Sequence, residues 1–101
     1  MNCLTMYDLR FHVEAAREYN QLQKAIRLKL HSKLLERLSQ PDVPSARLSG
    51  ELAGCFKIKL AREGVRLIYS IDSLQVIVKV ISIGKREDSA AYVAAVKRLG
   101  R

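Results

Sequence analysis

Three cationic side chains recur at alternate positions in the stretch CFKIKLAREGVRLIYS (Cys55–Ser70). Lys57 and Lys59 alternate with apolar residues before a turn at Ala61–Gly64, and Arg66 alternates with apolar residues after it. A period of two predicts a pair of strands whose polar residues share one face of a sheet. Like charges on paired strands repel one another. Two interpretations stay open: an ordinary solvated face, or a face that binds a polyanion.

Lysine, arginine and tyrosine are the residue types with which such a face could do chemistry. The sequence has no Gly-rich phosphate loop and no Cys/His cluster. His12 and His31 are far apart in the chain, so we expect surface or boundary residues, and a histidine-pair ribonuclease mechanism is poorly supported. Cys3 and Cys55 lack ligand partners at metal spacing and suit a reducing compartment, with a disulfide as the less favoured alternative. We expect no metal and no cofactor.

Cleavage of RNA by its own 2′-OH is a reaction that lysine, arginine and tyrosine could support. The protein must align the hydroxyl with the neighbouring phosphate, and it must stabilise the charge on the phosphorane. It must also move a proton off the 2′-OH and onto the leaving 5′-oxygen. Arginine matches phosphate oxygens with a planar fork, and a lysine crowded by other cations can act as a base. Tyrosine can stack on a nucleobase or help to move a proton.

The charge of the chain favours a phosphate-rich partner. The 101 residues carry a formal net charge of +8, and the excess of Lys and Arg lies mainly from Arg47 onward. Clustered positive charge binds nucleic acid through counterion release, although an acidic protein partner would also explain it. No run of about 20 apolar residues predicts a membrane span, and no signal peptide is evident. We expect one cytoplasmic domain over residues 1–101, with no membrane association.

The first half of the chain is predicted to be mainly helical. LTMYDLR (Leu4–Arg10) is a plausible first strand. An apolar stripe at helical spacing predicts helix over Val13–Gln40, with a break at Asn20–Gln21 into two helices. Pro41 and Pro44 end the second helix.

The second half is predicted to form the sheet. Ala46–Leu52 reads as a short extended piece before the two strands around Ala61–Gly64. A turn at Asp72–Ser73 leads into Leu74–Ile83, whose nearly continuous apolar run predicts a central strand that ends at Gly84–Lys85. Ser89–Leu99 is predicted to be a closing helix with Ser89 as its N-cap. The fold class is therefore α+β: a small antiparallel twisted sheet with an N-terminal helical pair on one face and a C-terminal helix.

Three segments carry a resemblance to a known family. They are FKIKLAREGVRLIY (Phe56–Tyr69), VISIGKRE (Val80–Glu87) and AYVAAVKR (Ala91–Arg98). In these motifs and over nearly its whole length, the chain resembles the RelE family of bacterial toxins, the messenger-RNA endonucleases of type II toxin–antitoxin systems. The resemblance implies the RelE/ParE-like fold, cleavage of messenger RNA on the ribosome, usually in its decoding site, and neutralisation by a cognate antitoxin.

The resemblance also implies a set of active residues. The family's basic residues match Lys57 and Lys59 in K-I-K, Arg66 in G-V-R and Arg86 in G-K-R-E, and its aromatic residue matches Tyr92. It implies that Lys59 accepts the proton and that Arg86 donates one or stabilises the leaving group. Lys57 and Arg66 would hold the phosphate, and Tyr92 would orient or stack on the base. The other basic residues of this half are predicted to dock on ribosomal RNA: Arg47, Arg62, Lys79, Lys85, Lys97 and Arg98.

Two other classes of function remain as alternatives. A related toxin with the same fold acts by binding DNA gyrase, and it would not need the basic and tyrosine set. A nonenzymatic RNA-binding domain would bind RNA and leave the message intact. For either toxin we expect an acidic or amphipathic, partly disordered antitoxin that docks on the helical stripe and on the exposed sheet edge.

Overall fold

The computed structural model describes residues 6–86 and 89–100. In chain order the elements are β1 (Asp8–Phe11), α1 (Val13–Gln21), α2 (Lys24–Ser39), the 3-10 turns η1 (Pro44–Ala46) and η2 (Gly50–Leu52), β2 (Cys55–Leu60), β3 (Val65–Asp72), β4 (Ile77–Lys85) and α3 (Ala90–Arg98). The predicted α+β class is confirmed. Leu4 and Thr5 of the predicted first strand, together with Cys3 and Glu87, lie outside the described residues.

The strands of the described chain form one four-stranded sheet in the order β1-β4-β3-β2. The predicted antiparallel hairpins β2–β3 and β3–β4 are confirmed, and β4 is central as expected. The expectation of a wholly antiparallel sheet is wrong for β1, which pairs with β4 in parallel. The chain between β1 and β4 contains two helices and the β2–β3 hairpin, and a connection of that length lets a strand return in the parallel sense.

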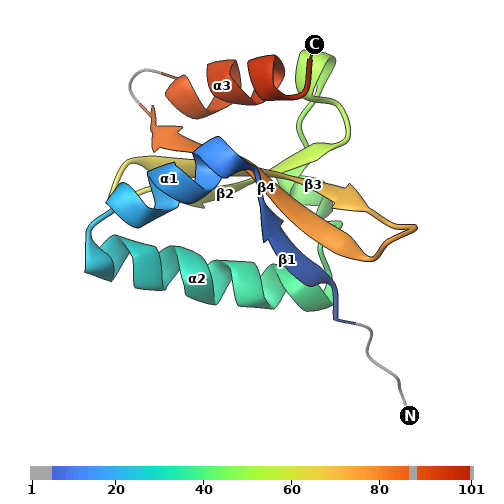
Figure 1. Cartoon of the computed structure of the whole chain (residues 1–101), viewed down its shortest axis with the longest axis horizontal. Helices are drawn as coiled ribbons and strands as arrows, with labels where there is room; N and C mark the ends of the chain where they lie inside the picture. The colour runs from blue at the N-terminus through green and yellow to red at the C-terminus, as the bar shows by residue number, and fades with distance from the viewer. Residues whose placement is uncertain (1–5, 87–88, 101) are drawn as a thin grey trace.

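Helices cover both faces of the sheet, as Figure 1 shows for α2 and α3 on its opposite sides. Leu30, Leu34 and Leu38 of α2 pack with Phe56, Ile58, Leu60 and other inward residues of the strands. On the other face, Ala91 and Ala95 of α3 pack against Ile68 and Ile81. Because successive strand residues point to opposite faces, the residues between Phe56, Ile58 and Leu60 lie on the α3 face.

The break between α1 and α2 falls at Leu22–Gln23, slightly after the predicted Asn20–Gln21. Leu22 is extended, and its partly buried side chain packs against the core. The guanidinium of Arg27 donates to the carbonyls of Asn20 and Leu22, at 3.3 and 3.2 Å. These bonds satisfy carbonyls that the end of α1 leaves without helical partners.

Three other local expectations are corrected. Residues 46–52 are not an extended piece, because 3-10 turns occupy 44–46 and 50–52 around one isolated bridge at Arg47. β4 begins at Ile77 instead of Leu74, because the carboxylate of Asp72 accepts hydrogen bonds from the amides of residues 74 and 75 and holds a turn there. At its other end the strand runs through Lys85. Ser89 occupies the N-cap position but makes no side-chain capping bond.

A buried tyrosine joins α2 to the strands that carry the cations. The hydroxyl of Tyr69 donates to the carbonyl of Pro41 at 2.7 Å and accepts from Arg37 at 2.8 Å. Arg37 also donates to the carbonyl of Lys57 at 3.3 Å. Burial raises the pKa of Tyr69 above its ordinary value although Arg37 opposes the rise. The backbone of Lys57 is therefore held by the guanidinium of Arg37, which the phenol of Tyr69 holds in turn.

Candidate functional site

A row of paired positions crosses the sheet on its α3 face. Lys59 is the direct partner of Arg66 in the β2–β3 ladder, and Arg66 is the partner of Gly84 in the β3–β4 ladder. Directly opposed residues have Cβ atoms about 5 Å apart, so two cations share one short span of surface. Lys59 is exposed and Arg66 is half-buried.

The guanidinium of Arg66 is held by the aromatic ring of α3. Its Nη1 donates to the hydroxyl of Tyr92 at 3.1 Å, and its Cζ lies 5.5 Å from the centre of the same ring. Both contacts attract a cation to a phenol. Within the described chain, Nε of Arg66 is buried and has no hydrogen-bond partner. A buried donor without a partner is costly, so the fold leaves this one group of the guanidinium unsatisfied.

α3 approaches the sheet closely at the row that carries Arg66. A Cβ atom on Gly84 would lie 2.8 Å from the amide nitrogen of Ala91, so a larger residue would push the helix away. Beside it, the buried hydroxyl of Ser82 donates to the carbonyl of Ala91 at 2.6 Å. These two contacts fix the first turn of α3, where Tyr92 is located.

Lys57 and Arg86 complete the predicted set at its two ends. Lys57 is half-buried, is paired with Ile68 and is two residues from Lys59, about 7 Å along the strand. The backbone amide of Arg86 donates to the carbonyl of Gly64 at 2.8 Å, which places the residue beside the β2–β3 turn. Its side chain is exposed.

Strand register and one hydrogen bond place four of the five predicted active residues on the same face of the sheet. Lys57, Lys59 and Arg66 follow from strand register, and Tyr92 follows from its bond to Arg66. Arg86 is placed by its backbone, two residues after the partner of Arg66. Cationic donors and a phenol on one face are the groups that bind a phosphate. Among the described residues, no three His, Cys, Asp or Glu side chains gather as metal ligands.

The predicted docking residues are spread over the molecule. Five are exposed: Arg47, Arg62, Lys79, Lys85 and Lys97. Lys79 lies opposite Arg10 in β1 and lines a hollow of about 590 Å³ beyond the end of α3. Lys85 lines a different pocket together with Glu63. These cations therefore do not form one continuous stripe around the central row.

Arg98, one of the predicted docking residues, is bonded within the fold. Its guanidinium donates to both carboxylate oxygens of Glu18, each at 2.8 Å, and to the carbonyl of Ile81 at 2.9 Å. Only 16% of its side chain is exposed. Glu18 is absent from the predicted set, because its only signal in the sequence is a charge beside the apolar stripe of a helix. We leave Arg98 out of the docking surface.

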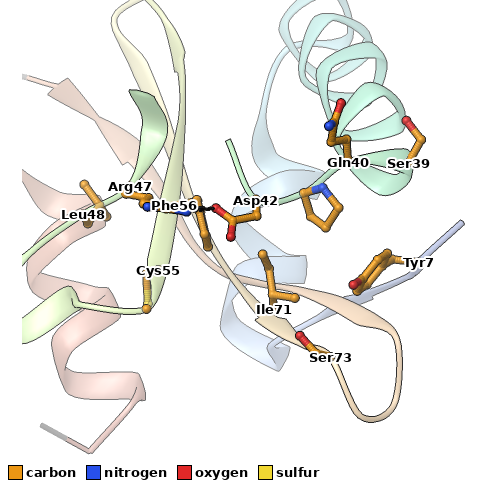
Figure 2. A pocket seen from close by; sticks show the side chains of 12 residues that line it. Tyr7, Ser39, Gln40, Asp42, Arg47, Leu48, Cys55, Phe56, Ile71 and Ser73 are labelled. Carbon is orange, nitrogen blue, oxygen red and sulfur yellow. Dashed lines mark hydrogen bonds and ion pairs between the residues drawn. The ribbon is translucent and has the colours of Figure 1, made fainter. Parts of the chain in front are cut away.

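One pocket lies away from the cationic row. It has a volume of about 730 Å³ and is enclosed by the end of α2, the start of β2 and the end of β3. Figure 2 shows its lining, including the ion pair of Arg47 with Asp42 at 2.9 Å, and none of the five predicted active residues belongs to it. A smaller hollow of about 300 Å³ adjoins Tyr92 and is lined also by Ser49, Glu51 and Leu52. Neither of these two pockets contains Lys57, Lys59, Arg66 or Arg86.

The chain is similar to known toxins in both sequence and fold. Residues 9–90 match the family described as the ParE toxin of type II toxin–antitoxin systems, parDE. The mRNA interferase toxin RelE of Escherichia coli K12 is 42% identical over 93 residues, which cover 92% of this chain and 97% of that protein. A mutant of the E. coli toxin RelE in the free state superposes with a TM-score of 0.84 at 40% identity, over 93% of this chain and 98% of that one. The toxin of the intact E. coli RelBE toxin–antitoxin complex gives a TM-score of 0.75 at 39% identity, over 78% and 95%.

Proposed function

Since the chain belongs to the RelE family of type II toxin–antitoxin toxins, we propose that it is an endoribonuclease that cleaves messenger RNA on the ribosome. The contact that carries the proposal is the bond between Arg66 and Tyr92, on the same face as Lys59. It joins a phosphate-binding fork, a phenol and a second cation at one place. The relative named an mRNA interferase supports the reaction class.

In the proposed reaction the 2′-oxygen of a ribose attacks the phosphorus that links it to the next nucleotide. The 2′-oxygen loses its proton, a P–O bond forms, and the bond to the 5′-oxygen breaks as that oxygen takes up a proton. The products are a 2′,3′-cyclic phosphate and a 5′-hydroxyl. The charge that develops on the phosphorane oxygens is what neighbouring cations stabilise most strongly.

We assign the steps to residues as the family resemblance implies, and their places around the row support the assignment. Lys59, exposed and opposite Arg66, accepts the proton of the 2′-OH. Arg66 and Lys57 hold the phosphate oxygens, since a guanidinium fork matches them with two parallel hydrogen bonds. Arg86, at the edge of the row, protonates or stabilises the leaving oxygen. Tyr92 orients or stacks on the neighbouring base.

The exposure of Lys59 and Arg86 is the reason for proposing that the ribosome takes part. Exposed side chains do not exclude water or fix the angle of attack, and both are needed for efficient in-line transfer. Ribosomal RNA would supply the missing wall, with the exposed cations Arg47, Arg62, Lys79, Lys85 and Lys97 docking on its phosphates. A cytoplasmic location follows from that target. No helix in the described part of the chain has the length and apolarity needed to cross a membrane.

A cognate antitoxin is the second proposed partner. The E. coli relative is seen bound to its antitoxin in the RelBE complex, and a mutant of it is seen with an antitoxin peptide. For this chain we propose an acidic or amphipathic antitoxin that covers the cationic face, because opposite charge gives fast and specific association.

The test is cleavage of a defined message by the purified chain, with and without programmed ribosomes. We expect discrete cuts in phase with codons only when ribosomes are present, with 2′,3′-cyclic phosphate and 5′-hydroxyl ends. An intact message under both conditions would overturn the proposal.

The family description of a ParE toxin makes gyrase binding the alternative to test in parallel. Inhibited supercoiling with an intact message would favour that alternative over the nuclease. RNA binding without cleavage and without effect on supercoiling would favour a nonenzymatic binding domain. Discrete message ends with unchanged supercoiling would exclude both of these functions.

A further inference from the structure

The edge of β4 that β1 leaves open is closed by the Glu18–Arg98 ion pair. β1 pairs with β4 only as far as Val80. Beyond that position, the carbonyl of Ile81 accepts from Arg98 at 2.9 Å, and the amide of Ile83 donates to Glu18 at 3.0 Å. A carboxylate and a guanidinium thus take the place of the missing strand, since each satisfies one backbone group of the edge.

This ion pair joins three elements at one point. Glu18 belongs to α1, and Arg98 is the last residue of α3, while the backbone groups that they bind belong to β4. The two parallel bonds between fork and carboxylate fix orientation as well as distance. The side chains are only 30% and 16% exposed, so loss of either partner would leave the other charge poorly solvated.

α3 is consequently held to the sheet at both of its ends. At the first turn, Ala91 is bound by Ser82 and packs closely on Gly84. At the last turn, Arg98 is bound by Glu18 and β4. Tyr92 follows Ala91 directly and lies about 9 Å along the helix from Arg98. Small rotations of a nine-residue helix are transmitted to the phenol unless both ends are fixed.

We propose that Glu18 is a positioning residue: through Arg98 it fixes α3 so that the hydroxyl of Tyr92 stays on the guanidinium of Arg66. The inference rests on the proposed endoribonuclease function. Glu18 itself is on a different element from every predicted active residue, and it acts on the reaction only through the helix. A displacement of about 1 Å at a reacting group can cost up to about a hundredfold in rate, so a tether at the far end of the helix matters.

The experiment compares Glu18→Gln with Glu14→Gln, a matched change on the exposed side of α1, where the carboxylate forms an ion pair with Arg17. Both are measured in the chain with Tyr92 and in a Tyr92→Ala chain, by single-turnover cleavage on programmed ribosomes. Arg98→Lys, which keeps the charge but loses the two parallel bonds, is the second variant. Thermal unfolding fixes a temperature at which every variant is folded.

We expect Glu18→Gln to lower the cleavage rate about tenfold or more relative to Glu14→Gln, with Arg98→Lys between them. In the Tyr92→Ala background the same change should have less than about a twofold effect, because there is no phenol left to position. Hydrogen exchange of the α3 amides should also be faster in Glu18→Gln. Equal losses in both backgrounds, or no loss in either, would overturn the inference.

Failure of this inference can be told apart from failure of the proposed function. If the unchanged chain does not cleave the message, the nuclease function fails and the α3 exchange experiment still tests whether Glu18 holds the helix. If the unchanged chain cleaves and Glu18→Gln cleaves equally fast, only the positioning role is lost.

Discussion

The hydroxyl of Tyr92 lies 3.1 Å from Nη1 of Arg66, so the phenol and the guanidinium are bonded to each other before any substrate is bound. The same guanidinium lies over the tyrosine ring, with 5.5 Å between Cζ and the ring centre. A phosphate that reaches Arg66 therefore meets a fork whose plane is already set. Preorganised donors of this kind stabilise developing charge without reorganising during the reaction.

Replacement of Arg66 tests the phosphate-binding role. Arg66→Ala should reduce ribosome-dependent cleavage by about 10²–10³-fold, the usual cost of removing one donor to developing charge. Arg17→Ala is the control, because Arg17 is exposed on α1 and pairs only weakly with Glu14. Cleavage rates under single-turnover conditions measure the effect, and full activity of Arg66→Ala would remove the residue from the site.

Changes at Tyr92 separate its ring from its hydroxyl. Tyr92→Phe keeps the ring over Arg66 and loses one hydrogen bond, so we expect a loss of about tenfold, in line with about 1.5 kcal/mol for a bond to a charged group. Tyr92→Ala removes the stacking surface too and should lose clearly more. Equal rates for the two variants would mean that the ring contributes nothing to cleavage.

The close approach of α3 to the sheet predicts the effect of a single methyl group. Gly84→Ala places a Cβ 2.8 Å from the amide of Ala91 and should destabilise the fold by about 1–3 kcal/mol as the helix shifts. Thermal or urea unfolding measures the change, with Ser73→Ala in an exposed turn as the control. Cleavage should fall as well, because the shift moves the first turn of α3. Unchanged stability would show that the helix is free to adapt.

Acid should weaken the tether between α1 and α3. Burial raises the pKa of Glu18, but the bonds from Arg98 and the Ile83 amide, with the charges of Arg98 and His12, more than offset this and hold the pKa below its ordinary value. A depressed pKa means that the carboxylate stabilises the fold above its unfolded-state pKa. This contribution is lost as the pH falls through the lower folded-state value. Unfolding free energies between about pH 7 and pH 3 should therefore decline less steeply in Glu18→Gln than in the unchanged chain.

Salt dependence tests the docking surface. Lys79→Gln or Lys97→Gln should weaken ribosome binding and reduce the slope of log affinity against log salt by up to about 1 for each phosphate that the variant no longer neutralises. Lys33→Gln, an exposed change on α2 outside the proposed surface, should leave the slope unaltered. Titration of labelled toxin onto ribosomes at several salt concentrations measures the slope. Equal slopes for all three variants would exclude these two lysines from docking.

Much of the fold follows from local pattern in the sequence. The alternation of apolar and charged residues on both sides of Ala61–Gly64 predicts the β2–β3 hairpin, and the continuous apolar run predicts the central strand β4. The limits of that strand were shifted because Leu74 is 97% exposed in a turn held by Asp72. Apolar character cannot reveal a carboxylate that captures backbone amides. The parallel pairing of β1 is a long-range contact, which no local period encodes.

The same distinction between local pattern and long-range contact applies to the candidate site. Strand alternation alone places Lys57, Lys59 and Arg66 on one face, and the structure agrees with that placement. Charge alone made Arg98 look available to RNA, whereas its partner Glu18 is 80 positions away in the sequence. A pairing between such distant residues depends on how α1 and α3 pack, and a single sequence holds no direct sign of it.

The closure of the β4 edge has a consequence for self-association. An unpaired strand edge invites a strand from another molecule, and proteins with such edges tend to aggregate. Here an incoming strand would first have to displace Glu18 and Arg98, which are bonded to the amide of Ile83 and the carbonyl of Ile81. The two side chains that hold α3 against the sheet therefore also oppose pairing between β4 and a strand of a second copy. This protection matters when the toxin is free of its antitoxin.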